Sequence, residues 1–402
     1  MQVDGEDDKP HLRMLLSQYP MRTRIFGELD TKSILNLCRT SSGLRADIYS
    51  YRWDINRRLE RFFQNPTVFR SALGQADALI TGSFALQFFT NKFWPESDLD
   101  INVQDGPGVV ILGKFLEAEG YELIGNRGEP FSDYEEVIVR LKHIRRILTF
   151  IKPQDISNDS SLELKVQLIV TCEQPVLAIL GSYYTSCVVN FITWNKAYCI
   201  FPRATLLFDE MVTLTTHSDY NVPLYNKYSK RGWRLRTRPI NLADTAENCS
   251  PRDIYPLGSC LNSDRRIGSK DTWTMKLGTA GVARPPQPDS VLEYSTFSVE
   301  VVRESTYPWE DFDNPLPSNS LRYQYTYGRF APFWLAVADV LVANTHGQLK
   351  TKMKKSEAEQ LASDYQGAIH RARFEKPDGW DYWDDWIPET FDNLQQRIES
   401  GS

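Results

Sequence analysis

The sequence predicts an α+β fold in which a mixed sheet is flanked by helices. Residues 78–81 form a short apolar run of the kind found in buried strands, and residues 162–170 alternate with a period of two. Residues 144–151 are predicted to pair antiparallel with that second segment. Apolar residues return at helical spacing elsewhere, as in 109–119. Because strand and helix patterns are interspersed, we expect a single core of both.

This core, residues 54–210, is one of four regions that we expect. Residues 1–15 are polar and charged and are predicted to be disordered. Residues 16–53 carry apolar pairs at helical spacing, which predicts a small helical module. Residues 211–402 are expected to form an α/β C-terminal region. Its predicted strands and helices cover 271–277, 295–303, 330–349 and 355–374.

Composition limits the class of protein. The chain has 402 residues, 41% hydrophobic and 12% aromatic, which fits a globular protein of two or three domains. The net charge of −6 argues against nucleic-acid binding by the whole surface. The six cysteines include no C-x-x-C pair, so we expect thiols in a reducing compartment.

The apolar segments of the chain bear on its location. The N-terminus is acidic and has no apolar stretch, which predicts that no secretory signal is present. The best apolar run, 333–343, is short and is interrupted by Asp339, so we expect no membrane span. These features predict an intracellular protein, cytoplasmic or nuclear.

Gly82 and Ser83 follow directly on the apolar strand at 78–81. Gly82 lets the backbone tighten, and Ser83 is predicted to cap a helix over 84–93. Free backbone N–H groups and the positive end of the helix would then point at one spot. The stretch therefore predicts a cradle for phosphate.

Two aspartates come one helical interval later. Asp98 and Asp100 stand two residues apart, so on a strand both carboxylates leave the same face while Leu99 and Ile101 point into the core. Adjacent carboxylates repel each other unless a cation lies between them, and Mg²⁺ prefers oxygen ligands. We therefore expect a Mg²⁺ site facing the cradle. The alternative is a strand end with two solvated aspartates.

In these residues the sequence resembles the nucleotidyltransferase superfamily, which has the polymerase-β-like fold. The signature of that superfamily is a Gly-Ser at a strand end, a helix, and then an Asp-x-Asp strand. The resemblance implies that Gly82 and Ser83 hold a nucleoside triphosphate and that Asp98 and Asp100 bind Mg²⁺. It also implies a nucleotidyltransferase-like mixed sheet over 54–210. The helical module followed by these motifs is similar to a large group of uncharacterised fungal proteins.

The superfamily has a third carboxylate on a later strand, which completes the catalytic metal site and receives the proton of the attacking hydroxyl. The matching position in this sequence is Gln167. Its amide is neutral and is a poorer Mg²⁺ ligand than a carboxylate. Glu163 lies on the same strand face, but four residues of strand span about 13 Å. Nucleotide binding is therefore expected, while catalysis at Asp98, Asp100 and Gln167 is left open.

Within 16–53 the sequence resembles an F-box. It has the pair Ile25-Phe26, a second apolar segment around Leu35, and Trp53 at its end. The resemblance implies a three-helix module that docks on a Skp1-like adaptor of a cullin ubiquitin ligase, with Ile25, Phe26 and Leu35 in or near the interface. The alternative is a helical cap that buries these residues against the next domain of the same chain.

Residues 225–238 combine six basic residues with Tyr225, Tyr228 and Trp233. Charge and stacking together could hold a polyanion such as nucleic acid. Basic residues just before Gly232 are also typical of a helix C-terminus, here followed by an edge strand. We favour the helix end.

Two functions from different classes follow. The first is an NTP- and Mg²⁺-binding protein of nucleotidyltransferase fold, which is an enzyme if the site is active. The second is an F-box-type substrate adaptor of a cullin ubiquitin ligase whose nucleotidyltransferase-like domain is catalytically inactive. A nucleic-acid binder using 227–238 is a third, weaker hypothesis.

Overall fold

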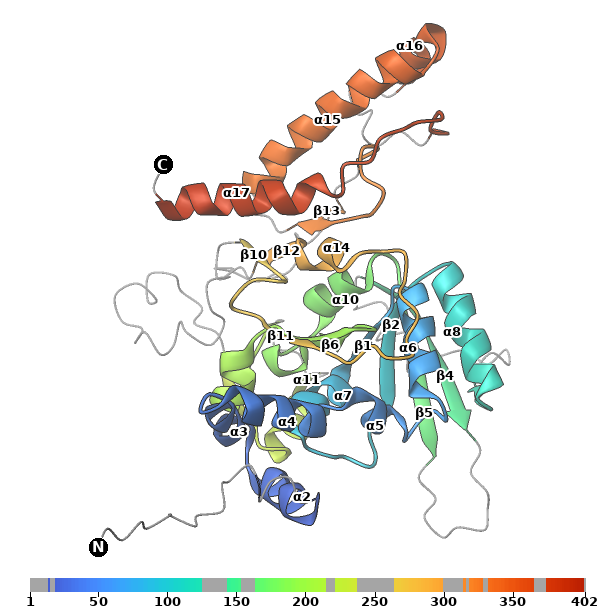
Figure 1. The fold of residues 1–402 in the computed structure, drawn as a ribbon. Helices are drawn as coiled ribbons and strands as arrows, with labels where there is room; N and C mark the ends of the chain where they lie inside the picture. The colour runs from blue at the N-terminus through green and yellow to red at the C-terminus, as the bar shows by residue number, and fades with distance from the viewer. Residues whose placement is uncertain are drawn as a thin grey trace, which may run out of the picture.

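The computed structural model of the chain describes residues 14, 19–124, 143–152, 163–214, 221–236, 264–298, 314–315, 318–327, 332–364 and 374–400. At its centre is a mixed eight-stranded sheet with the order β11-β7-β6-β1-β2-β5-β4-β3, flanked by helices (Figure 1). The predicted α+β class, with a mixed sheet and flanking helices, is confirmed. The strands of this sheet are β1 (Leu79–Thr81), β2 (Leu99–Gln104), β3 (Glu122–Ile124), β4 (Ile144–Lys152), β5 (Leu164–Thr171), β6 (Asn190–Ile192), β7 (Lys196–Cys199) and β11 (Trp273–Lys276).

The pairing around β2 brings three strands together at the end where β1 finishes. β1 runs antiparallel to β2, with Thr81 opposite Asp100. β2 runs parallel to β5, with Asp100 beside Gln167. β4 and β5 pair antiparallel, which confirms the prediction for 144–151 and 162–170. Thr81, Asp100 and Gln167 therefore lie in one row across the sheet.

The sheet carries the main hydrophobic core on one face. Leu99 and Ile101 of β2 are fully buried, as predicted, and pack in a cluster with Phe84 and Phe88. The other face packs against a second cluster that includes Leu177. The helical elements of this part of the chain are α5 (Ile55–Leu59), α6 (Pro66–Gln75), α7 (Gly82–Thr90), α8 (Pro107–Ala118), α10 (Pro175–Ser182), the 3₁₀ helix η1 (Ser186–Val188) and the π-helix η2 (Arg203–Leu207).

Helix α7 differs from the prediction at both ends. It begins at Gly82, with Thr81 in the N-cap position, so Ser83 lies in the first turn and is not the cap. The helix begins two residues earlier than expected because Gly82 itself turns the chain, at a φ of +65°. The helix ends at Thr90 because Asn91 adopts a left-handed conformation, with a φ of 56°.

The N-terminal helices pack against the core of the same chain. They are α2 (Tyr19–Glu28), α3 (Thr31–Cys38) and α4 (Ser42–Arg52). The indole of Trp53 donates a hydrogen bond to the carbonyl of Phe89, 3.3 Å away, and its ring meets Trp273 edge-on. Thr31 donates to the carbonyl of Thr90, at 3.4 Å. The module therefore covers the end of α7, as the cap alternative describes.

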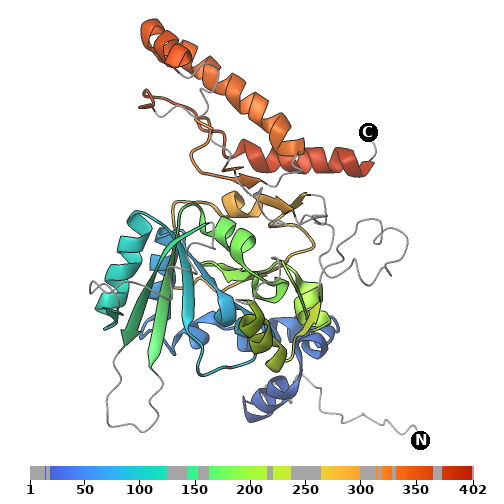
Figure 2. The ribbon, with the colours of Figure 1, turned by 180° about the vertical axis from the view of Figure 1, so that it is seen from behind.

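The remainder of the chain begins beside the sheet and extends away from it. Strand β11 completes the edge of the central sheet, whereas α15 to α17 lie at the opposite end of the molecule from the N-terminal helices (Figures 1 and 2). The helices predicted at 330–349 and 355–374 are found as α15 and α16, and residues 365–373 and 299–303 lie outside the described residues. The elements are β8 (Glu210–Val212), α11 (Asn221–Lys230), β9 (Arg234–Arg236), β10 (Asp264–Arg266), α14 (Asp289–Glu293), β12 (Thr296–Ser298), β13 (Asn314–Pro315), β14 (Thr326–Tyr327), α15 (Pro332–Lys352), α16 (Lys355–Asp364) and α17 (Trp386–Ser400).

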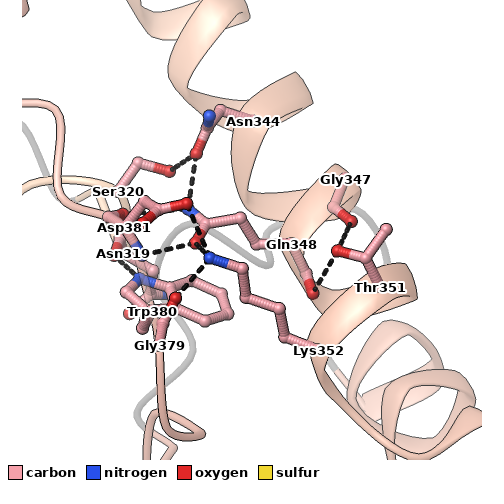
Figure 3. A network of polar contacts seen from close by, with 10 residues as sticks. All are labelled: Asn319, Ser320, Asn344, Gly347, Gln348, Thr351, Lys352, Gly379, Trp380 and Asp381. Carbon is pink, nitrogen blue, oxygen red and sulfur yellow. Dashed lines mark hydrogen bonds and ion pairs between the residues drawn. The ribbon is translucent and has the colours of Figure 1, made fainter.

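Polar contacts attach the segment before α17 to α15 (Figure 3). The side-chain amide of Gln348 exchanges two hydrogen bonds with the backbone of Asp381, at 2.9 and 2.7 Å. Lys352 forms an ion pair with the Asp381 carboxylate at 2.6 Å. The buried indole of Trp380 donates to the carbonyl of Asn319 at 2.8 Å. Within the described part of the chain, no helix is both long and apolar enough to cross a membrane.

Candidate functional site

The carboxylate of Asp100 lies directly over the bend at Gly82. A Cβ atom added to Gly82 would stand 2.3 Å from Oδ2 of Asp100, far closer than a carbon and an oxygen can approach. Gly82 also has a φ of +65°, which residues with a side chain rarely adopt. The start of α7 and the acid on β2 therefore occupy one site, and only glycine fits between them.

Asp98 has a basic partner on the neighbouring strand. Its carboxylate forms an ion pair with Lys165 at 2.9 Å, and both side chains are about one-third exposed, at 33% and 31%. Lys165 lies two residues before Gln167 and on the same face of β5. Glu163 precedes the strand and is exposed. Lys165 was missed in the sequence, although the period-two pattern that places Gln167 also places it.

The positive charges of nearby lysines only partly offset the negative charges of Asp98 and Asp100. Burial, and then the neighbouring charge of Asp98, raise the pKa of Asp100 to about 6, while Lys227 and Lys165 act in the opposite direction. Lys227 belongs to α11, far away in the sequence. Two carboxylates meet here, and two lysines from different elements oppose their repulsion.

A buried polar layer supports the strand ends behind Asp100. The Tyr183 hydroxyl donates to Oγ1 of Thr81 at 2.7 Å and lies 3.3 Å from Oδ1 of Asn102. Thr81 in turn donates to the same Asn102 oxygen at 2.9 Å. Burial and the charge of Asp100 raise the pKa of Tyr183, which keeps its hydroxyl protonated. No local pattern in the sequence pointed to this layer.

Ser83 is buried, with 6% of its surface exposed, and contributes through its backbone. Its carbonyl accepts a hydrogen bond from the amide of Gln87 at 3.3 Å, and the amide oxygen of Gln87 accepts from the backbone N–H of Trp94 at 2.6 Å. Gln87 thus connects the first turn of α7 to the loop that leads to Asp98. The geometry holds that loop next to the helix start.

The basic segment forms a helix end over its described residues 225–236, as we favoured, while residues 237 and 238 lie outside the described residues. α11 stops at Lys230, Gly232 follows with a φ of +108°, and β9 begins at Arg234. Tyr225, Tyr228 and Trp233 are buried in a cluster with residues such as Leu86. In this conformation the three rings are therefore covered by packing and are not exposed for stacking on nucleic-acid bases.

The expected adaptor-binding residues differ in exposure. Phe26 is 1% exposed and packs in the main core cluster, so its ring is not accessible to a partner in this conformation. Ile25 and Leu35 are half-buried and pack against the same cluster. The spacing of apolar residues indicated buried helix faces. It did not indicate whether a partner protein or the rest of this chain buries them.

The side chains at the site suit one kind of metal complex. Among the described residues, no group of three or more acidic, histidine or cysteine side chains could hold a metal ion by itself. Asp98 and Asp100 supply two carboxylates, and Gln167 offers an amide oxygen beside Asp100. Mg²⁺ is commonly bound by one or two carboxylates together with phosphate oxygens of a nucleotide. The residues therefore fit Mg²⁺ carried by a nucleotide.

Comparison with protein-family models, with curated proteins and with solved structures found no significant match.

The close approach at Gly82 leads to a first prediction. Gly82→Ala should lower the free energy of unfolding by about 2 kcal/mol or more, because the new Cβ strains the left-handed backbone and displaces the Asp100 carboxylate. Urea unfolding measures this change. Gly113→Ala in α8 is the matched control: a Cβ there meets nothing within 4 Å, so stability should stay level or rise by about 0.5–1 kcal/mol. Equal effects of the two substitutions would contradict the predicted contact.

The raised pKa of Asp100 leads to a second prediction. Its pKa is about 6 in the folded protein against an ordinary 3.8, so the folded state binds more protons between these values and stability falls as pH rises through this window. Above pH 6 the ionised carboxylate therefore costs folding free energy, on the order of 3 kcal/mol. Asp100→Asn should be close to neutral at pH 4 and stabilising at pH 7.

The measurement is urea unfolding of the wild type and Asp100→Asn at both pH values. Asp378→Asn is the control, because it makes the same chemical change at an exposed position. A stability difference for Asp100→Asn that is the same at pH 4 and pH 7 would show that the carboxylate is not destabilised by its surroundings.

Proposed function

We propose that this protein binds a nucleoside triphosphate with Mg²⁺ at Gly82, Ser83, Asp98 and Asp100, on a fold of nucleotidyltransferase type. The observation that carries the proposal is the carboxylate of Asp100 lying over the bend where α7 begins. It joins the two halves of the motif, which are 18 residues apart in the sequence, at one spot. The register that sets Gln167 beside Asp100 supports the same assignment, since this is the position of the third acid in the family that the sequence resembles.

Each residue has a defined task in this proposal. The backbone N–H groups at Gly82 and Ser83, at the positive end of α7, bind phosphate oxygens. Asp98 and Asp100 hold Mg²⁺, which supplies positive charge to the phosphates. Lys165, which is paired with Asp98, would contact a phosphate oxygen when Mg²⁺ is bound. The polar layer of Tyr183 keeps the ends of the strands fixed.

Gln167 favours binding over transfer. A carboxylate at this position can accept the proton of an attacking hydroxyl, whereas a neutral amide cannot act as a base in this way. The chain therefore keeps the groups that position a nucleotide and lacks one group that the reaction uses. We therefore propose that this protein transfers nucleotides slowly at most and acts mainly by binding them.

The F-box-type adaptor of a cullin ubiquitin ligase is the alternative. Ile25 and Leu35 are not fully buried and would be the contacts of a Skp1-like partner. The burial of Phe26 and the packing of the module onto the end of α7 favour a role within the chain. An adaptor with a nucleotide-binding domain would combine both functions.

The nucleotide site is tested by titration of ATP, GTP, CTP and UTP, with Mg²⁺ and with EDTA, by calorimetry. At least one nucleotide should bind in a Mg²⁺-dependent way, and Asp98→Asn combined with Asp100→Asn should weaken it at least tenfold, because the metal loses both carboxylates. Asp378→Asn controls for the loss of one negative charge at an exposed position. Unchanged affinity in the double variant would exclude the proposed metal site.

The role of Gln167 is tested by Gln167→Asp. Release of pyrophosphate from the bound nucleotide should rise over the wild type, by on the order of 10²-fold if the new carboxylate acts as a general base. The comparison needs equal nucleotide affinity in the two proteins, measured in the same titration. A variant that binds nucleotide and Mg²⁺ but gains no activity would contradict the assignment of Gln167 to the third position.

A further inference from the structure

A cavity lies between the N-terminal helices and α7. Its volume is about 390 Å³, and it is bounded by residues of α2, α4, α5 and α7. Four of the residues that line it are arginines: Arg52, Arg57, Arg58 and Arg61. We call this cavity the arginine pocket.

Three of the four arginines in this pocket form no ion pair with the described acidic side chains. No carboxylate of the described residues lies within ion-pair distance of Arg52, Arg58 or Arg61. The acid that lines the pocket, Asp54, accepts hydrogen bonds from two backbone N–H groups at the start of α5, at 3.0 and 3.3 Å. The pocket therefore gathers positive charge.

Backbone carbonyls hold these guanidinium groups in place. Arg52 donates to the carbonyls of Phe26 and Leu29, at 2.8 and 3.0 Å. Arg58 donates to the carbonyl of Lys92 at 3.2 Å, and Arg61 donates to that of Trp94, also at 3.2 Å. Neutral acceptors fix the geometry of the cations without cancelling their charge. A ligand would therefore meet groups that are already ordered.

Arg52 has a buried N–H group without a hydrogen-bond acceptor among the described residues. Its side chain is 3% exposed, and the N–H group is that of Nε. Burial is the main cause that lowers the pKa of Arg52 to about 10, and the charge of Arg58 acts in the same direction. The pKa of Arg58 is also lowered, first by burial and then by the charge of Arg57. Crowded cations of this kind are relieved by an anion.

We propose that the arginine pocket binds a small molecule that carries phosphate groups. Guanidinium groups match phosphate oxygens in pairs, and several cations around one cavity suit an anion with more than one charge. A cavity of about 390 Å³ is of a size that holds small ligands. The proposal does not depend on the nucleotide site, because none of the residues that line the pocket is assigned to that site.

Arg57 and Arg61 are the residues with which to test the pocket. Arg57 is exposed, so Arg57→Gln removes a charge at the mouth with little effect on folding. Arg61 carries a second charge and lies close enough to Asp98 for that carboxylate to act on its pKa, against the dominant lowering by burial. Arg24→Gln, on the exposed surface of α2, is the matched control because it removes the same charge outside the pocket.

The experiment is calorimetric titration of the full chain with tripolyphosphate in EDTA, which keeps metal-dependent binding silent. The wild type should bind, and Arg57→Gln and Arg61→Gln should each weaken binding by on the order of tenfold, as loss of a charged hydrogen bond predicts. Arg24→Gln should bind as the wild type does. Thermal unfolding in the absence of ligand checks that each variant is folded.

Three results would overturn the proposal: no binding to the wild type, binding unaffected by Arg57→Gln and Arg61→Gln, or an equal loss with Arg24→Gln, which would show general attraction of anions to the surface. If the nucleotide titrations show no binding, the tripolyphosphate experiment can still be interpreted. Each proposal can therefore be rejected independently of the other.

Discussion

The contact between Gly82 and the Asp100 carboxylate is the constraint on which the rest of the site depends. With Oδ2 of Asp100 only 2.3 Å from where a Cβ would stand, the end of β1, the start of α7 and the start of β2 must meet without a side chain between them. The antiparallel register of β1 and β2 and the parallel register of β2 and β5 place Thr81, Asp100 and Gln167 in a row. The close approach at Gly82 is therefore compatible with one register of these strands and with one geometry of the site.

The charges at this site differ from those of a cluster of three acidic side chains. The third position is a neutral amide, and the positive charges near the pair belong to lysines: Lys165 is paired with Asp98, and the charge of Lys227 acts on Asp100. A lysine beside a carboxylate lowers the cost of burying it without any metal. In the nucleotide site that we propose, the same lysines would lie close to phosphate oxygens, and the neutral amide of Gln167 would favour binding over transfer.

Helix α7 is the element around which distant parts of the chain assemble. The N-terminal module reaches its C-terminal end through Trp53 and Thr31, and α11 packs Tyr228 in a cluster with Leu86. Strand β11 adds a segment from beyond residue 270 to the central sheet. Regions that look separate in the sequence therefore share one packed body, because the apolar faces of each are buried against the others.

The sequence by itself determined the strand that carries Gln167, the buried positions Leu99 and Ile101, and the Gly82 turn, because alternation and glycine placement are local properties of the chain. It missed the first two residues of α7 by assigning the cap to Ser83. Only the tertiary structure decided that Tyr183 supports Thr81, 102 residues away, that Lys227 lies near Asp100, and that four arginines surround one cavity. Such long-range contacts depend on how whole helices and strands pack, and no local pattern in the sequence predicts them.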